Sequence, residues 1–296
     1  MKHESRLHGL APADAARLLV EAIPYVRRFA GKAVVVKLGG NAIDHRLDQA
    51  LAQDVLLLKS VGVRCVVVHG GGPQIDATLK AFDIERKFAG GFRVTDAPTL
   101  DIVRMTLVGK VNRDLVAKIN RETDDDPVAV GVSGEDGGLL VARQRDPALG
   151  FVGDVEMVRA SILERLLDED LVPVVSTVGA DRSGQPYNIN ADAAACAIAA
   201  AMGAEKLVYL TAAPGLLADP SDPDSVIGRL SPAEARALVD DHSVSDGMIP
   251  KLSGCLEAVE QGVGSAHILD GRIAHSLLIE MLTESGIGTM IAKEQP

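Results

Sequence analysis

Hydrophobic and polar positions along the chain follow two alternating patterns, one typical of buried strands and one of amphipathic helices. Short Val-rich runs such as KAVVVKLGG (32–40) and RCVVVHGGG (64–72) are each followed by apolar residues at helical spacing. Repeated strand–helix units of this kind favour a mainly parallel sheet with helices on both faces. We therefore expect an α/β fold, a three-layer αβα sandwich with a mainly parallel central sheet.

The same patterns predict the remaining elements. Residues 11–30 have apolar residues at helical spacing and predict a helix, or a helix pair kinked at Pro24, outside the main sheet. Residues 139–158 predict an inserted antiparallel hairpin. Further helices are expected near 46–62, 73–82, 99–120, 160–168, 191–202 and 231–239 and from Pro250, and further strands within 127–136, 171–180, 205–211, 265–271 and 289–293.

These elements group into three parts. Residues 1–31 hold the N-terminal helix, residues 32–204 form a first lobe, and residues 205–296 form a second lobe. The boundary near 204 lies where the Ala-rich helix ends and a new succession of strands and helices begins.

The amino-acid composition limits the classes of partner that we expect for this protein. Hydrophobic residues make up 47% of the chain and aromatic residues only 3%, an aliphatic bias that suits buried parallel strands. The net charge of −11 repels nucleic acid and anionic lipid, so neither is expected as a partner. The chain shows no signal peptide and no apolar run of membrane-spanning length, and its three separated cysteines are typical of reduced core thiols. We expect a cytoplasmic protein.

Two glycine clusters follow predicted strands directly. Gly39 and Gly40 come after Lys37, and the second cluster, 70–72, comes after His69. Each could be only a tight strand-to-helix turn. However, successive strands of one sheet bring both clusters to the same edge, where bare backbone N–H groups hold anions. The chain lacks GxxxxGK[ST] and a full dinucleotide fingerprint, so the glycines predict an anion site without identifying the anion.

Four charged residues could complete such a site. Lys37 either extends out of its strand end or faces a bound anion, and Lys251 opens a helix, where a cation opposes the helix dipole. Asp192 is either an acid favoured by a helix N-terminus or the group that orients both lysines. Arg93, in GGFRVT, offers a bidentate fork to a carboxylate or forms a surface salt bridge. Two such lysines could neutralise charge on a phosphoryl group in transfer.

Seven segments together resemble the N-acetylglutamate kinases, a branch of the amino-acid kinase family. The resemblance runs in order from about residue 32 to the C-terminus, and its most specific parts are the second, third and sixth segments. The segments are VVVKLGGNA (34–42), VVVHGGGPQI (66–75), GGFRVTD (90–96), GVSGEDGGL (131–139), PVVSTVG (173–179), NINADAAA (188–195) and GMIPK (247–251).

The resemblance implies a carbamate kinase-like fold and a function. The first lobe would bind N-acetyl-L-glutamate and form dimers, and the second would bind ATP with the Mg²⁺ it carries. The kinase would phosphorylate the γ-carboxylate in arginine biosynthesis, with no metal ligand supplied by the protein. The implied residues are Lys37, Lys251 and Asp192 for catalysis, Gly71, Gly72, Arg93, Asn190 and Ala191 for substrate, and Lys37, Gly39, Gly40, Thr211, Gly215 and Lys251 for ATP.

One departure from the family pattern concerns the nucleotide side. The family usually has Leu-Thr-Asp where this chain has Leu210, Thr211 and Ala212. Two alternatives stay open: another small-carboxylate kinase of the same fold, acting for example on aspartate or an aminoadipate derivative, or a non-catalytic sensor of arginine or acetylglutamate. Arg93 and the NINAD segment favour N-acetylglutamate over the first, and Ala212 alone supports the second.

The N-terminal helix also has a counterpart in the family. It resembles the extension of arginine-inhibited members, which links dimers into a hexamer, a trimer of dimers; a plain solubilising helix is the alternative. The resemblance leaves open whether the chain stays a homodimer and whether a nitrogen-signalling protein binds. The residues that it places at an arginine site are Tyr25, Lys206, His267, Glu280 and Gly286.

Overall fold

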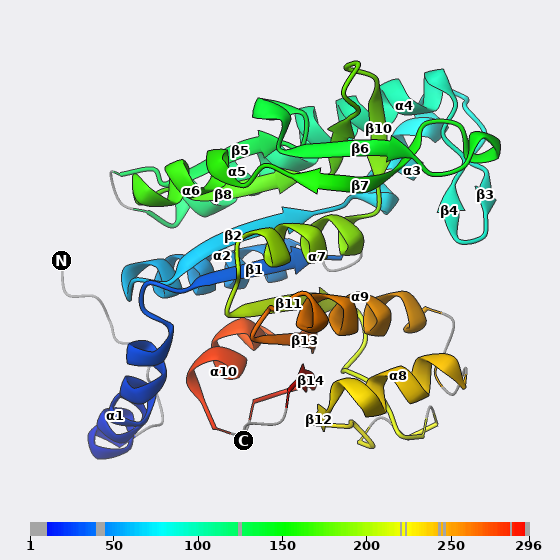
Figure 1. The fold of residues 1–296 in the computed structure, drawn as a ribbon. Coiled ribbons are helices and arrows are strands. Elements are labelled where there is room, and N and C mark those ends of the chain that lie inside the picture. Colours follow the sequence, from blue (N-terminus) through cyan, green and yellow to red (C-terminus); the bar gives the residue numbers. More distant parts are fainter. Residues whose placement is uncertain are drawn as a thin grey trace.

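The computed structural model describes residues 11–39, 45–123, 126–219, 221–222, 224–241, 244, 247–284 and 286–293. Within these residues, eight strands form one central sheet in the order β12-β14-β13-β11-β1-β2-β8-β5 (Figure 1). Neighbouring strands run parallel except for β13 and β14, which are antiparallel. The strands are β1 (Ala33–Leu38), β2 (Arg64–His69), β5 (Ala129–Ser133), β8 (Val172–Ser176), β11 (Lys206–Thr211), β12 (Arg229–Leu230), β13 (Ser265–Asp270) and β14 (Thr289–Ala292).

Helices cover both faces of this sheet, which confirms the predicted three-layer αβα sandwich. Val35 of β1 faces one hydrophobic cluster, and its neighbours Val34 and Val36 face the other, as the two-residue period of a strand requires. The first cluster is covered by α6 (Ser161–Asp168), α7 (Ala191–Ala201), α8 (Pro232–Asp240) and α9 (Ile249–Glu260). The second is covered by the end of α1 (Pro12–Phe29), by α2 (His45–Ser60), by α5 (Asn112–Arg121) and by α10 (Ser276–Leu282).

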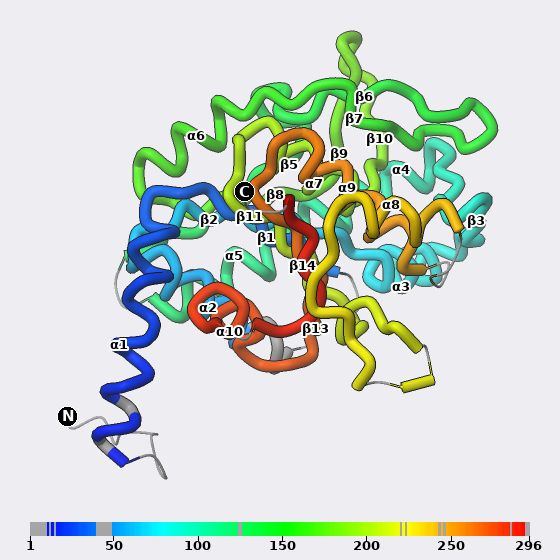
Figure 2. The backbone as a smooth tube through the Cα atoms, turned by 60° about the horizontal axis from the view of Figure 1, so that its bottom comes forward, coloured from blue at the N-terminus to red at the C-terminus, as the bar shows by residue number. Residues whose placement is uncertain are grey.

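The N-terminal helix α1 is a single helix that continues through Pro24. It extends away from the body of the molecule, as Figure 2 shows. Its last turn packs against the core through Phe29, but four large apolar residues stay exposed: Leu18, Leu19, Val20 and Ile23. A helix with such a face is expected to bury it on another surface.

The long helix predicted over 99–120 is present with an irregular centre. It starts as α4 (Ala97–Arg104), widens into a π-helical segment, η2 (Met105–Val111), and continues as α5. A side-chain cap starts it, since Asp96 accepts a hydrogen bond from the Thr99 N–H at 3.0 Å. Wide π turns of this kind often occur near functional sites.

A second, smaller sheet closes on itself. The expected hairpin is present as β6 (Leu140–Gln144) and β7 (Val152–Val158), which pair antiparallel. The run 171–180, predicted as one strand, is divided at Thr177 into β8 and β9 (Val178–Ala180), and β9 joins β10 (Pro186–Ile189) in the small sheet. Close backbone approach makes the closure possible, because a Cβ at Gly179 would lie 2.7 Å from the Leu140 carbonyl oxygen.

Two further elements border the site described below. Helix α3 (Gly72–Ala81) begins at the last residue of the second glycine cluster, and β3 (Phe88–Ala89) with β4 (Phe92–Arg93) forms a short hairpin beside it. Cys65, Cys196 and Cys255 are all buried and unpaired. Within the described ranges, none of the helices combines the length and the hydrophobicity that a membrane span needs.

Candidate active site

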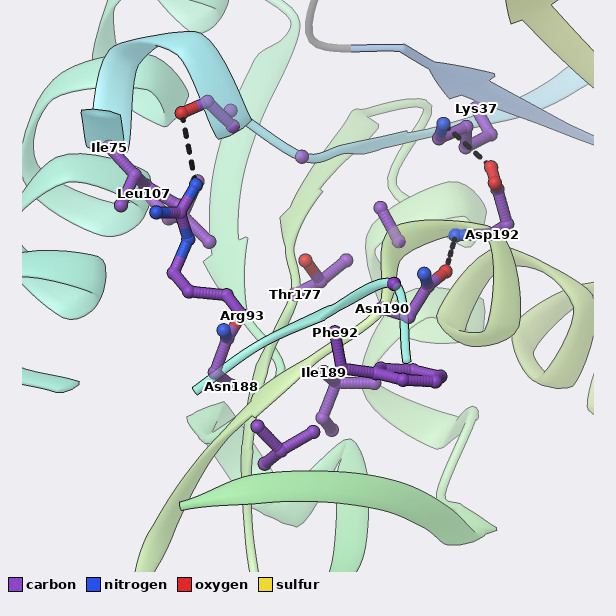
Figure 3. Close-up of a pocket in the computed structure, with 16 residues that line it drawn as sticks. Lys37, Ile75, Phe92, Arg93, Leu107, Thr177, Asn188, Ile189, Asn190 and Asp192 are labelled. Carbon is purple, nitrogen blue, oxygen red and sulfur yellow. Dashed lines mark hydrogen bonds and ion pairs between the residues drawn. The ribbon is translucent and has the colours of Figure 1, made fainter. Parts of the chain in front are cut away.

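A cavity of about 230 Å³ opens at the carboxyl ends of β1 and β2 (Figure 3). Three segments surround it: the glycine cluster before α3, the β3–β4 hairpin, and the stretch from β10 into α7. This is the edge at which open α/β sheets bind ligands. The polar and glycine residues that line the cavity are Lys37, Gly70, Gly71, Gly72, Gly91, Arg93, Thr177, Asn188, Asn190 and Asp192.

Lys37, Asp192 and Lys251 form one buried ionic cluster, which we call the Asp192 cluster. Lys37 Nζ lies 2.6 Å from Asp192 Oδ1, and Lys251 Nζ lies 3.4 Å from Asp192 Oδ2. The three residues come from β1, the first turn of α7 and the first turn of α9. Their side chains are only 8%, 13% and 25% exposed, in the order Lys37, Asp192, Lys251. The structure thus brings together the three residues that the sequence predicts to handle the phosphoryl group.

The protonation state of Asp192 follows from its two partners. Burial alone would raise the pKa of this carboxyl group, but Lys37 and Lys251 outweigh it and hold the pKa below the ordinary value. Asp192 is therefore ionised at neutral pH, and two ammonium groups share one carboxylate. The cluster carries a net positive charge, and two of its members, Lys37 and Asp192, line the cavity.

The N-terminus of α7 is fixed by Asn190. The Asn190 side-chain oxygen accepts hydrogen bonds from the Asp192 N–H at 2.8 Å and from the Ala193 N–H at 3.2 Å (Figure 3). Tyr209 anchors the same turn, since its hydroxyl donates to the Asp192 carbonyl oxygen at 3.0 Å. Ala191 lies against the glycine cluster, where a Cβ at Gly70 would be 3.3 Å from the Ala191 Cβ.

The predicted glycines differ in their surroundings. A Cβ at Gly71 would lie 2.8 Å from Leu107 Cδ2, whereas a Cβ at Gly72 would meet nothing within 4 Å, so the cavity side of Gly72 is open. The sequence predicts that Gly39 offers its amide to an anion, but in this structure the Gly39 N–H donates to the Leu210 carbonyl oxygen at 3.0 Å. Gly40 lies outside the described residues.

Arg93 enters the cavity from β4 and is held on three sides. Its Nη1 lies 2.6 Å from Asp76 Oδ1, and its Nη2 donates to the Gly72 carbonyl oxygen at 3.4 Å. Its guanidinium also lies 4.8 Å from the centre of the Phe88 ring. The side chain is 8% exposed, which excludes the alternative of a surface salt bridge.

The residues predicted on the nucleotide side lie around the carboxyl end of β11. Thr211 lies next to Gly39 across the sheet and is buried, and its hydroxyl accepts a hydrogen bond from the Ala213 N–H at 3.0 Å. Gly215 has a φ of 146° and packs against Thr289, while Ala212 is exposed. These three residues do not line the cavity above. Among the described residues, no group of three or more His, Cys, Asp or Glu side chains could hold a metal ion.

A second buried cluster lies at the opposite end of β11, and we call it the Glu280 cluster. Glu280 Oε1 lies 2.8 Å from His267 Nδ1 and 3.6 Å from Lys206 Nζ, and Glu280 Oε2 accepts a hydrogen bond from the Ile287 N–H at 2.9 Å. A cavity of about 190 Å³ adjoins it. His267 reaches this cavity only through Glu280, and the other four residues predicted at an arginine site line it directly: Tyr25, Lys206, Glu280 and Gly286.

Burial shifts the pKa values in the Glu280 cluster as well. It lowers the pKa of Lys206 and of His267, because a buried cation loses its hydration. Burial also acts to raise the pKa of Glu280, but His267, the Ile287 N–H and Lys206 outweigh it and leave that pKa below the ordinary value. Glu280 is thus an anion beside a neutral imidazole at pH 7.

Sequence reasoning missed several residues of the site. Asn188 lines the cavity two residues before Asn190, and the two-residue period of a strand could have indicated it. Asp76 follows the quoted HGGGPQI segment by one residue, but nothing in the sequence joins it to Arg93. The remaining side chains depend on packing alone for their place in the cavity lining, among them Phe92, Leu107 and Thr177.

The fold and the site are those of a phosphotransferase, with a cationic cluster and glycine amides at the edge of a parallel sheet. The family model for the amino acid kinase family matches residues 32–270. The chain belongs to the amino acid kinase family.

Individual relatives cover nearly the whole chain. A protein of Nostoc sp. (strain PCC 7120) named acetylglutamate kinase is 50% identical over 96% of both chains. A Gloeobacter violaceus protein of the same name is 46% identical over 97% of this chain and 95% of its own.

Solved structures agree with this fold. N-acetylglutamate synthase from Neisseria gonorrhoeae, complexed with coenzyme A and L-arginine, matches with a TM-score of 0.82 at 28% identity, covering 94% of this chain. This chain spans 65% of that synthase chain. Giardia lamblia carbamate kinase bound to AMP-PNP, at 19% identity and a TM-score of 0.68, shares the fold; the match covers 90% of this chain and 99% of that one.

Proposed function

We propose that the protein transfers the γ-phosphoryl group of ATP to the γ-carboxylate of N-acetyl-L-glutamate, giving N-acetyl-L-glutamyl 5-phosphate in arginine biosynthesis. Relatives named acetylglutamate kinase, at 50% identity over 96% of the chain, support the substrate. The observation that carries the chemistry is the Asp192 cluster, two lysines on one buried carboxylate beside an anion-sized cavity.

The acceptor carboxylate makes an additional base unnecessary. Its ordinary pKa is about 4.3, so it is ionised at neutral pH and can attack phosphorus directly. What the protein must supply is alignment and neutralisation of the negative charge shared by two anions. Lys37 and Lys251 supply that charge in this proposal, and Asp192 holds both at one position.

Arg93 and the N-terminus of α7 orient the substrate. Arg93 binds the α-carboxylate, while Asn190 and Ala191 contact the acetamido group. The amides of Gly71 and Gly72 face the reacting carboxylate and the phosphoryl group that it accepts, at the start of α3, where the helix dipole favours an anion. The low exposure of Arg93 supports this, because a carboxylate contact shielded from water is worth more than an exposed one.

The nucleotide occupies the second lobe, 205–296, in this proposal, and the first lobe, 32–204, binds the acetylated amino acid and forms the dimer. Mg²⁺ enters as part of the nucleotide substrate. Binding at Gly39 requires its N–H to exchange the Leu210 carbonyl oxygen for a phosphate oxygen. The residues that surround ATP on this view are Lys37, Gly39, Gly40, Thr211, Gly215 and Lys251.

Trapping the product with hydroxylamine tests the reaction. Purified protein, MgATP and N-acetyl-L-glutamate should give a hydroxamate, and aspartate or N-acetylaminoadipate at the same concentration should give far less. A faster reaction with either alternative would assign a different carboxylate. Tight binding of N-acetylglutamate without hydroxamate would instead favour the non-catalytic sensor.

We further propose that arginine binds beside the Glu280 cluster and inhibits the enzyme. Glu280 offers a buried carboxylate to a cationic side chain, and Tyr25 of α1 borders the same cavity. The arginine complex of the matched synthase supports a ligand of this class. Arginine must bind the inhibited arrangement more tightly than the active one, because equal affinity would shift nothing.

The exposed apolar face of α1 could couple this inhibition to contacts between subunits. Exchange of α1 between neighbouring dimers would bury Leu18 and Leu19 and join three dimers into a hexamer. Removing residues 1–30 should then leave active dimers with weak or absent arginine inhibition, which light scattering and activity assays can measure. Dimers still inhibited at the wild-type arginine concentration would refute this coupling.

A further inference from the structure

His69 ends β2 immediately before the glycine cluster and is fully buried. Its Nδ1 lies 2.9 Å from the Gly70 carbonyl oxygen, and its Nε2 lies 3.1 Å from Asn112 Nδ2. Both ring nitrogens are thus engaged inside the protein, so His69 is not placed to exchange a proton with a substrate. A buried histidine that contacts the loop beneath a candidate anion site calls for another explanation.

The contacts of His69 fix which nitrogen carries the proton. A carbonyl oxygen can only accept, so Nδ1 must donate to Gly70, and Nε2 must then accept from Asn112. Asn112 is fixed in turn, because its Nδ2 also donates to the Val174 carbonyl oxygen at 2.8 Å and its Oδ1 accepts from Arg113. Burial lowers the pKa of His69 to about 4, in agreement with a neutral ring at pH 7.

The held carbonyl determines where the next amide points. In a trans peptide, the C=O of one residue and the N–H of the following residue point in opposite directions. Anchoring the Gly70 carbonyl on the His69 ring therefore directs the Gly71 N–H away from that ring. Gly70 and Gly71 both line the cavity, and in the described part of the chain the Gly71 N–H makes no hydrogen bond.

Packing also restrains the same peptide. The π-helical segment η2 supplies Leu107 and Val111, which would lie 2.8 and 3.2 Å from a Cβ on Gly71, and Asn112 follows directly on the same helix. One helix therefore packs against Gly71 and supports His69. Two glycines lose more conformational entropy on becoming ordered than other residues do, and these contacts offset that loss.

We propose that His69 is a positioning residue, which uses its neutral ring to hold the Gly70–Gly71 peptide so that the Gly71 N–H faces the transferring phosphoryl group. The inference rests on the proposed kinase function. It assigns His69 an effect on the transition state and not on the affinity for either substrate, because oriented donors matter most where charge develops.

Two variants of His69 test whether the N–H donor must lie at the position of Nδ1 or at that of Nε2. The amide nitrogen of His69→Asn can occupy the place of Nδ1, whereas that of His69→Gln corresponds to Nε2. We expect His69→Asn to keep kcat within about fivefold of wild type and His69→Gln to lower it by roughly 10- to 100-fold, with the KM for both substrates within about threefold. Asn112→Leu should lower kcat by a smaller factor.

The kinetics of the two variants test the positioning role of His69. Equal kcat for the Asn and Gln variants, high or low, overturns the positioning role, as does a loss that appears in KM alone. Thermal unfolding checks that the two variants are folded at the assay temperature. Hydroxylamine trapping on the wild type is run first: an inactive wild type overturns the proposed function and this role with it, whereas an active wild type with indistinguishable variants overturns this role only.

Discussion

The Asp192 and Glu280 clusters have the same plan at opposite ends of neighbouring strands. Each places one buried carboxylate against two basic side chains from separate elements. Lys37 lies near the carboxyl end of β1, and Lys206 opens β11, the strand paired with β1. Both carboxylates have a lowered pKa despite burial. In both clusters, two basic partners keep a buried carboxylate ionised.

The two clusters differ in the second basic partner. Asp192 has two lysines, so its cluster keeps a net positive charge that suits an anion in transfer. Glu280 has one lysine and His267, whose pKa burial lowers, so its cluster is close to neutral at pH 7. A neutral cluster whose carboxylate lines a cavity suits a ligand that brings its own cation. In the proposed function, the identity of one side chain thus separates a site for phosphoryl transfer from a site for a basic amino acid.

The largest expected effect is a loss of kcat when a lysine of the Asp192 cluster is replaced, but not when Lys206 of the Glu280 cluster is replaced. Lys37→Ala and Lys251→Ala should each lower kcat by about 100-fold or more with little change in KM, because the missing charge acts mainly in the transition state. Lys206→Ala is the matched control, a buried lysine on a carboxylate at the other end of the sheet, and it should keep kcat near wild type. Steady-state kinetics without arginine measures all three. Near-normal turnover in Lys37→Ala would remove its assigned role.

Arg93→Ala should give the next largest effect, on binding instead of turnover. Loss of a bidentate carboxylate contact should weaken N-acetylglutamate binding by roughly 1.5–3 kcal/mol and leave ATP binding unchanged. Calorimetry with each ligand separately measures both. Arg145→Ala is a suitable control, because this arginine also lies over an aromatic ring, at 4.0 Å from the centre of Phe92, but does not line the cavity. Unchanged acetylglutamate affinity in Arg93→Ala would contradict the assignment.

A pH-dependent effect on stability should come from the Glu280 cluster. Burial holds the pKa of His267 below its ordinary value of 6.5. Below pH 6.5 the unfolded chain therefore takes up a proton that the folded His267 resists, so the free energy of unfolding falls as the pH falls. His267→Gln removes this contribution and should reduce the loss of unfolding free energy between about pH 7 and pH 5.5 by about 1 kcal/mol. Urea unfolding at the two pH values measures it.

Ser265→Ala is the control for the pH experiment. This variant keeps the imidazole and removes only the hydroxyl that lies 2.8 Å from His267 Nε2. It should therefore retain most of the pH dependence of the wild type. An unchanged pH dependence in His267→Gln would show that His267 makes no such contribution.

The smallest expected effect concerns Ala212, at the carboxyl end of β11. A carboxylate at this exposed position would face the proposed nucleotide side, so Ala212→Asp should tighten ATP binding by a few-fold or change its dependence on Mg²⁺. Ala218→Asp, at another exposed alanine of the following loop, controls for the added charge. Titrations of nucleotide at several Mg²⁺ concentrations measure the difference. Equal behaviour of both variants and wild type would mean that the site is complete with alanine.

Much of the fold could be predicted because its signals are local. Val-rich runs, helical spacing and glycine turns are read within a few residues. They predicted the strands of the central sheet except β12, its covering helices except α10, and the β6–β7 hairpin. The division of 171–180 at Thr177 and the π-helical segment at Met105–Val111 could not be predicted in this way. Both depend on what packs against them: the small sheet that receives β9 in the first case, and the glycine cluster in the second.

The sequence by itself determined which chemical groups are present and which strand or helix end carries each. Lys37 before a glycine turn and Asp192 at a helix start were identified from the residues themselves, and Glu280 was identified through the family resemblance. Only the tertiary structure decided which of them meet. Parallel strands and their crossovers bring distant residues to one edge, so Asp192 contacts Lys37 and Lys251, and Asp76 contacts Arg93. The physical reason is that such contacts depend on the order of strands in the sheet, which no short stretch of sequence specifies.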